Sequence, residues 1–157
     1  MTSTHPVPSI SRKILPPHWF LSTLLLEIAL DRWVPIAELV PRPFNYLGAL
    51  FVAAGLVITI WGVLLFRSSK TGVVPFSEST SLVMGGPYRF TRNPMYLGMV
   101  LVLLGVAVLL GSAPAFFVPP AFAVLITYLF ILPEEGHMER AFGASYLERK
   151  RQIRRWL

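Results

Sequence analysis

Two segments of this sequence carry residue types that could bind or transform a ligand. The first, residues 86–98, places Arg89, Arg92 and Asn93 directly ahead of an apolar stretch. We expect Asn93 to cap a helix and Pro94 to occupy its first turn. The free N–H groups of that helix start, with the two arginines, would favour a carboxylate or a phosphate. The alternative is a simple helix cap whose arginines contact lipid headgroups.

The second segment, residues 133–146, is rich in acidic side chains. Glu135 and Glu139 stand four residues apart, so they share one face of a helix. They could pair with Arg89 or Arg92, or they could bind an amino group or ribose hydroxyls. The alternative is a run of solvated charge. The two segments together predict a site for an anionic or zwitterionic ligand, without specifying a reaction.

The sequence also excludes several kinds of site. No G-x-G-x-x-G follows a strand, and no phosphate-binding P-loop is present. The three histidines lack metal-ligand spacing. The absence of cysteine excludes disulfides, thiol catalysis and thiolate metal sites.

The elements that position these segments are apolar helices. The chain is 54% hydrophobic and 14% charged, whereas soluble domains carry about 25% charged residues. Uncharged stretches extend over residues 46–66 and 93–133. Because a span needs roughly 20 apolar residues, the second stretch predicts two helices. We therefore expect an all-α integral membrane protein with about four transmembrane helices, at 14–31, 45–66, 94–111 and 115–132, and a cytoplasmic C-terminal helical segment.

The distribution of basic residues predicts the orientation of these helices. The net charge is +6, and a four-span topology leaves only Arg32 and Arg42 on the outer side. This is the positive-inside pattern, so both termini and the 67–93 loop should be cytoplasmic. Anionic lipid headgroups then explain the basic surplus better than nucleic acid does. The predicted cytoplasmic set is Arg12, Lys13, Arg67, Lys70, Arg89, Arg92, Arg140, Arg149, Lys150, Arg151, Arg154 and Arg155.

One membrane domain should cover residues 1–157. We divide it into a mobile tail (1–13), a first helical pair (14–66), a cytoplasmic loop (67–93), a helical hairpin (94–132) and a cytoplasmic closing segment (133–157). The N-terminal region does not resemble a signal peptide, because its apolar stretch contains His18 and Glu27 and no small-x-small cleavage site follows.

Small residues and prolines predict how the helices pack. Gly48, Gly55 and Gly62 recur every seven residues, as do Gly98, Gly105 and Ser112, so each set should form a stripe along which two helices approach closely. Pro119-Pro120 predicts a kink in the fourth span, and Gly143 predicts a break in the C-terminal helix. Glu27, an ionisable group inside a span, is a functional candidate, but we expect it to be structural or to lie near the outer interface.

The two polar segments together resemble a known family. The run G-P-Y-R-x-x-R-N-P-x-Y-x-G (86–98), followed by E-E-x-x-x-x-x-x-F-G-x-x-Y (134–146), is similar to the isoprenylcysteine carboxyl methyltransferases and phospholipid methyltransferases. The resemblance extends over residues 62–157, including the lead-in from Lys70 to Ser81. It implies methyl transfer from S-adenosylmethionine, bound without a Rossmann domain at the cytoplasmic helix ends. A small amphipathic or lipid-like acceptor would enter from the bilayer.

The resemblance also implies roles for particular residues. Glu134 and Glu135 would contact the polar end of the cofactor, and Tyr146 and Arg155 would belong to the segment that closes over it. Arg89 could orient an acceptor carboxylate, whereas Glu135 or Glu139 could remove a proton from an amine acceptor. The cofactor pocket would be shaped by Tyr88, Arg92, Asn93, Pro94, Tyr96 and Gly98.

Three departures from the family pattern bear on the acceptor. Asn93 stands where histidine is common, Arg149 replaces an aromatic three residues after Tyr146, and the chain stops shortly after Ile153. Two alternatives remain open. One is a NADPH-dependent sterol or steroid reductase relative, which would need more spans, and the other is a non-enzymatic membrane protein of the same fold.

Overall fold

The computed structural model describes residues 15–34, 36–68 and 85–157. Over these residues the protein is all-helical, as predicted, and the only extended pairing is an isolated antiparallel bridge between Glu38 and Ser112. The expectations for the 1–13 tail and for Lys70 to Ser81 lie outside the described residues. The elements in chain order are α1 (Pro16–Trp33), η1 (Phe44–Leu47), α2 (Gly48–Ser68), η2 (Gly86–Arg89), α3 (Pro94–Leu110), η3 (Ala113–Phe117), α4 (Val118–Ile126), η4 (Thr127–Ile131), α5 (Leu132–Phe142) and α6 (Ala144–Gln152).

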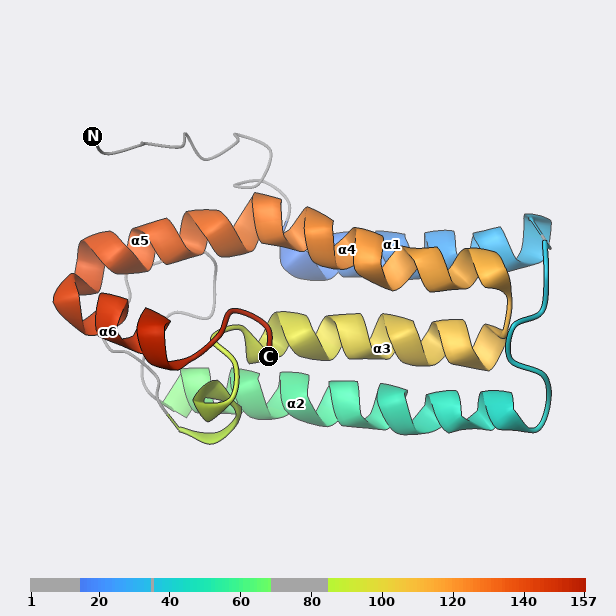
Figure 1. Cartoon of the computed structure of the whole chain (residues 1–157), viewed down its shortest axis with the longest axis horizontal. Coiled ribbons are helices and arrows are strands. Elements are labelled where there is room, and N and C mark those ends of the chain that lie inside the picture. Colours follow the sequence, from blue (N-terminus) through green and yellow to red (C-terminus); the bar gives the residue numbers. More distant parts are fainter. Residues whose placement is uncertain (1–14, 35, 69–84) are drawn as a thin grey trace.

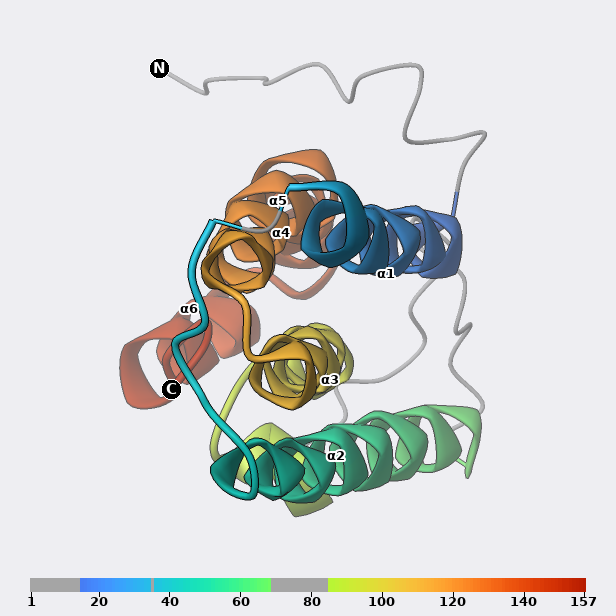
Figure 2. The same cartoon turned by 90° about the vertical axis from the view of Figure 1, so that its right-hand side faces the viewer.

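The long helices lie side by side, and α5 and α6 extend from one end of the bundle (Figure 1). Seen from the other end, α3 lies between α2 and α4, and α1 lies beside α4 (Figure 2). Two helical stretches are long and apolar enough to cross a bilayer, Phe44–Ser68 and Ala113–Phe142, and Pro94–Leu110 is apolar but shorter. The outer surface of α2 is correspondingly apolar, with Leu50, Ile60 and Leu64 exposed.

The glycine stripes mark the closest helix approach, as predicted. A Cβ atom on Gly55 of α2 would lie 2.5 Å from the carbonyl oxygen of Gly98 in α3. A Cβ atom on Gly105 would similarly lie 2.7 Å from the carbonyl oxygen of Gly48. The prediction was wrong for Ser112, because α3 ends at Leu110 in a left-handed Gly111, and Ser112 belongs to the connection that follows.

The fourth apolar stretch forms one continuous helical run with the acidic segment. Pro119 and Pro120 occupy the first turn of α4, where a missing N–H costs little, so the kink predicted there was wrongly placed. The helix departs from α-geometry at η4, a π-helical turn in which the Leu132 N–H donates to the Thr127 carbonyl. Pro133 follows directly and cannot donate to the preceding turn, so the π turn accommodates a proline inside the helix. The helix therefore carries Glu134 and Glu135 rigidly beyond the apolar region.

Gly143 breaks the C-terminal helix, as predicted. Its φ of +52° lies in the region that favours glycine, and it separates α5 from α6. The chain then turns back, so that α6 and the C-terminus lie near the start of α3 (Figure 1).

The Glu27 side chain of α1 is fully buried within the protein rather than exposed at its surface. Neither of its carboxyl oxygens has a hydrogen-bond partner among the described residues. The core next to α1 is apolar, with Leu103, Phe122 and Ile126 buried and Phe20 packed against them. Glu27 therefore contributes an unfavourable buried polar group, and its depth in a membrane stays a prediction.

Adding a methyl group at Gly55 should separate α2 from α3. The new Cβ atom would meet backbone atoms of Gly98 and Val102, which cannot move independently of their helix. We expect Gly55→Ala to destabilise the protein by about 1–3 kcal/mol, measured as a lower thermal unfolding midpoint in detergent. Gly85→Ala is the control, because nothing lies within 4 Å of its Cβ position. Equal midpoints for the two variants would contradict the close approach.

Replacing Glu27 by methionine should stabilise the protein. The substitution removes two buried oxygens without a partner, whose burial costs about 1–3 kcal/mol. We expect Glu27→Met to raise the thermal unfolding midpoint, while Glu38→Met, at an exposed position, leaves it unchanged. A lower midpoint for Glu27→Met would show that the carboxyl group has a favourable partner.

Candidate functional site

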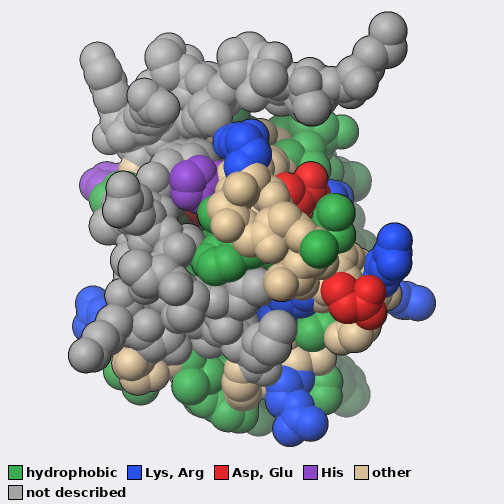
Figure 3. Space-filling view, turned by 90° about the vertical axis from the view of Figure 1, so that its left-hand side faces the viewer, with side chains coloured by type: hydrophobic (Ala, Val, Ile, Leu, Met, Phe, Trp, Pro, Cys, Tyr) green, Lys and Arg blue, Asp and Glu red, His purple; other side chains and the backbone are tan. Residues whose placement is uncertain are grey.

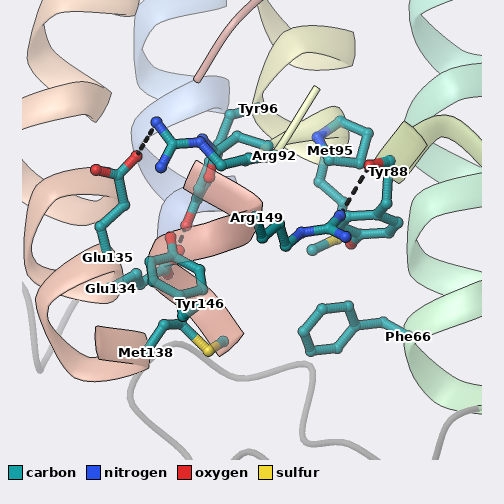
Figure 4. A pocket seen from close by; sticks show the side chains of 12 residues that line it. Phe66, Tyr88, Arg92, Met95, Tyr96, Glu134, Glu135, Met138, Tyr146 and Arg149 are labelled. Atoms are coloured by element: carbon teal, nitrogen blue, oxygen red, sulfur yellow. Dashed lines mark hydrogen bonds and ion pairs between the residues drawn. The ribbon is translucent and has the colours of Figure 1, made fainter. Parts of the chain in front are cut away.

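A pocket lies at the end of the bundle where α3 begins and the acidic segment emerges. It holds about 660 Å³ of empty space, counting the part open to solvent, and we call it the end pocket. Figure 3 looks onto this end, where basic and acidic side chains gather beside α5 and α6. The pocket is lined by Phe66, Tyr88, Arg92, Asn93, Pro94, Met95, Tyr96, Glu134, Glu135, Met138, Tyr146 and Arg149 (Figure 4).

The carboxylate of Glu135 joins three segments at one wall of the end pocket. It accepts hydrogen bonds of 2.9 Å from both Nε and Nη2 of Arg155. Arg92 Nη2 lies 3.2 Å from one carboxylate oxygen and Lys150 Nζ lies 3.9 Å from the other. The side chains of Glu135 and Arg92 are only 5% and 8% exposed. Three cations around one buried carboxylate fix its position at the pocket wall.

Backbone contacts hold the C-terminal segment (153–157) against the start of α3. The Arg92 N–H donates to the Arg154 carbonyl at 3.1 Å. The Arg155 carbonyl accepts from the Thr91 hydroxyl at 3.0 Å and from the Asn93 side-chain amide at 3.1 Å. Asn93 does occupy the N-cap position, but its side chain makes no capping bond, so that prediction was wrong. Thr91 instead accepts from the Asn93 N–H and shapes the turn into α3.

The polar side of the end pocket offers groups of both charges. Glu134 accepts a 2.8 Å hydrogen bond from the Tyr96 hydroxyl. Arg92 has two further nitrogens, Nε and Nη1, that are buried without a partner among the described residues. Buried donors of this kind are normally satisfied, so a ligand that accepts hydrogen bonds from Arg92 would remove an unfavourable term. A carboxylate beside an under-used guanidinium suits a zwitterionic ligand.

The opposite side of the end pocket is mostly apolar. Phe66 at the end of α2 packs against Tyr88, with ring centroids 5.9 Å apart. Met95 lies in the same wall (Figure 4). Arg149 from α6 is 6% exposed and donates a 2.8 Å hydrogen bond from Nη2 to the Tyr88 carbonyl. The pocket therefore has an acidic and basic side near α5 and an aromatic side with one cation near α2.

Burial and nearby charge alter the acidity of several pocket groups. Burial raises the pKa of Tyr146 to about 12, and the Glu135 charge acts in the same direction. Burial, followed by the charge of Glu134, also raises the pKa of Tyr88. Hydrogen bonding to Glu135 raises the pKa of Arg155. Both tyrosines therefore remain protonated near neutral pH and can donate hydrogen bonds to a ligand.

The structure brings together most of the residues predicted for the site, but not all. Arg89 is exposed on η2 and does not line the end pocket. Glu139 is one-third exposed, pairs with Lys150 and also lies off the pocket. Gly98 packs against Thr59 and Gly55 of α2 and serves helix packing. Arg155 is not on the pocket lining, but it binds Glu135, which is. The predicted residues on the pocket lining are Tyr88, Arg92, Asn93, Pro94, Tyr96, Glu134, Glu135 and Tyr146.

Sequence reasoning missed three residues that shape the site. Thr91 is 1% exposed and binds the C-terminal segment. Its position two residues before the helix cap is typical of a hydroxyl that bonds the local backbone, so the signal was available. Arg149 and Lys150 follow Tyr146 by three and four residues, which places all three on one face of α6. That spacing predicts a shared face but not a shared pocket.

An apolar helical bundle with a polar end pocket is the arrangement of a membrane protein that handles a small ligand at one end. Residues 44–145 match the pattern of the family described as phospholipid methyltransferase. The chain belongs to this family, as the sequence motifs indicated, and is thus a membrane methyltransferase. An uncharacterized protein from Haemophilus influenzae is 36% identical over 63 residues, which are 40% of this chain and the whole of that protein.

Neutralising Glu135 should open the end pocket. In Glu135→Gln, the charge that holds Arg92, Lys150 and Arg155 together is lost. Loss of charge-assisted hydrogen bonds of this kind costs about 1.5–3 kcal/mol. We expect faster trypsin cleavage after Arg154 and Arg155 with little change in helix content. Glu148→Gln is the control, because Glu148 pairs only on the exposed surface of α6. Equal cleavage rates in the two variants would contradict the role assigned to Glu135.

Proposed function

We propose that the protein transfers a methyl group from S-adenosylmethionine to a small amphipathic or lipid-like acceptor. The observation that carries the proposal is the guanidinium of Arg92. It is buried in the end pocket with two unpartnered nitrogens, next to the carboxylates of Glu134 and Glu135. Membership of the phospholipid methyltransferase family supports a methyl donor as the ligand.

The residues present fit this cofactor. Its amino acid end carries a carboxylate, which suits the free Nε and Nη1 of Arg92, and an amino group, which suits Glu134. Ribose hydroxyls could be bound by Glu134 or by the Tyr146 hydroxyl. Met95 and Met138 supply apolar surface for the adenine ring. When bound, S-adenosylmethionine supplies a methyl group on a positively charged sulfonium, which becomes a neutral thioether after transfer.

The chain's own residues contribute placement and exclusion of water. The Glu135 ion pairs and the bonds to the Arg155 carbonyl hold the C-terminal segment across the pocket wall. Trp156 of that segment packs against the apolar core and anchors it. A carboxylate acceptor would need only orientation and a dry site. An amine acceptor would also need a proton acceptor, a role that Glu134 cannot take while it holds the amino group of the cofactor.

The proposed orientation places the end pocket at the cytoplasmic face. Nine basic residues of the described ranges belong to the pocket end of the four-span topology, and only Arg32 and Arg42 belong to the other. This distribution supports cytoplasmic exposure of that end by the positive-inside rule. We propose a bacterial inner membrane as the location, where an acceptor would reach the pocket from the lipid.

Calorimetric titration with S-adenosylhomocysteine, the demethylated form of the cofactor, tests the proposal. We expect saturable binding to the detergent-purified protein, and no binding of NADPH in a parallel titration. Saturable binding of NADPH alone would move the protein to the reductase alternative. Absence of both would favour the non-enzymatic alternative and would contradict the proposed function.

Substitution of Arg92 tests where the cofactor lies. Arg92→Ala removes the guanidinium expected to bind its carboxylate, so the dissociation constant for S-adenosylhomocysteine should rise by roughly tenfold or more. Arg140→Ala, on the exposed face of α5, is the control and should leave the affinity within about twofold. Unchanged affinity in Arg92→Ala would show that this arginine serves the helix start or the lipid headgroups instead.

A further inference from the structure

Arg149 differs from the other cations that border the end pocket. Arg92, Lys150 and Arg155 each have a carboxylate within 4.0 Å. Arg149 has no such partner among the described residues, and its hydrogen bond there is to the neutral carbonyl of Tyr88. It is nevertheless only 6% exposed. Burying a guanidinium without an anion is unfavourable, and burial accordingly lowers the pKa of Arg149.

A buried hydroxyl lies beside Arg149. The hydroxyl of Tyr88 is buried, has no hydrogen-bond partner among the described residues and belongs to a side chain that lines the end pocket. Tyr88 is 5% exposed. Its ring lies next to the Arg149 guanidinium, on the side of the pocket away from Glu135 (Figure 4). A guanidinium without a carboxylate partner and a hydroxyl without a hydrogen-bond partner, both judged among the described residues, therefore lie together, within reach of the charge of Glu134.

The surroundings of this pair are apolar. Phe66 packs on Tyr88 at the end of α2, and Met95 lies in the same wall. The outer surface of α2 carries exposed apolar side chains, including Trp61 and Leu64, which precede Phe66 by five and two residues. The pair therefore lies beside the apolar wall formed by Phe66 and Met95, on the side of the pocket away from Glu135 (Figure 4).

We propose that Tyr88 and Arg149 form a subsite for an anionic group of the methyl acceptor, a carboxylate or a phosphate attached to an apolar chain. That the ligand is the methyl acceptor rests on the proposed function. That its group is anionic rests on the Arg149 guanidinium, which has no carboxylate partner among the described residues, and on the unpartnered Tyr88 hydroxyl. Arg149 is thus a specificity-determining residue, selecting anionic amphiphiles over neutral ones of the same length. The aromatic wall accommodates the first part of the apolar chain.

The alternative is that Arg149 only joins α6 to η2 through the Tyr88 carbonyl. Tyr88→Phe separates the two roles, because it removes the hydroxyl and keeps both the ring and the backbone carbonyl that Arg149 binds. A purely structural Arg149 would leave this variant indistinguishable from wild type. Tyr128→Phe, at a position 67% exposed on η4, is the matched control.

The test is calorimetric titration of the full-length protein in an uncharged detergent with dodecanoate, dodecyl phosphate and dodecanol. We expect wild type to bind at least one of the anions roughly tenfold more tightly than the alcohol, since a charged hydrogen bond contributes about 1.5–3 kcal/mol. Tyr88→Phe and Arg149→Gln should both reduce that preference, and Tyr128→Phe should retain it. Which anion binds more tightly identifies the headgroup as carboxylate or phosphate.

The same samples are titrated with S-adenosylhomocysteine, which separates this proposal from the proposed function. Lost anion preference in both Tyr88→Phe and Arg149→Gln, with the preference kept in Tyr128→Phe, supports the subsite. Anion preference without S-adenosylhomocysteine binding in wild type would support the subsite and contradict the methyltransferase assignment. No anion preference in wild type, or a preference unaffected by Tyr88→Phe, would overturn the proposal.

Discussion

The buried carboxylate of Glu135 is the interaction on which the end pocket depends. It sits at the end of a helical run that begins inside the apolar bundle, and it attracts Arg92 from the start of α3 and Arg155 from the C-terminal segment. These two cations would repel each other and the nearby Lys150 without it. One acidic side chain therefore joins segments that are 43 and 20 residues away in the sequence. A buried ion pair of this kind contributes specificity of arrangement more than net stability.

The position of that carboxylate is set by apolar packing. The glycine contacts between α2 and α3 fix the start of α3, and with it Arg92 and Tyr96, relative to Phe66. The π turn at η4 allows the fourth apolar stretch to continue through Pro133, so that Glu134 and Glu135 emerge on a rigid helix rather than a loop. Rigid positioning of polar groups at the ends of packed helices is what a small, selective binding site requires.

Local sequence signals predicted the elements better than their contacts. The apolar stretches, the glycine stripes and the break at Gly143 were predictable because each depends on residues close in the chain. The grouping of Arg92 with Glu135 was among the pairings predicted, since both segments were expected at one end of the bundle. The partner of Asn93 was not predictable, because its amide binds a carbonyl 62 residues away. The burial of Glu27 was not predictable for a related reason: it depends on how α1 packs, which its own sequence does not specify.

The sequence was also misleading where a family pattern suggested a role that geometry assigns elsewhere. Arg89 belongs to the same motif as Arg92, yet it lies on the exposed side of η2. Arg149 breaks the family pattern and still enters the pocket, with Tyr88 as its neighbour. Periodicity cannot distinguish these arginines, because the direction of each side chain follows from a short 3-10 turn and from the return of the chain after Gly143. The grouping of Arg149 with Tyr88 in the pocket therefore emerged only from the three-dimensional arrangement.

The most direct test of this account is amide hydrogen exchange with and without S-adenosylhomocysteine, followed by mass spectrometry of peptides covering the whole chain. The account predicts that the ligand slows exchange at the start of α3, in α5 and α6, and in the C-terminal segment, and leaves the connection over residues 36–47 unchanged. Slower exchange confined to that opposite end, or no change anywhere, would contradict the claim that the end pocket binds the methyl donor.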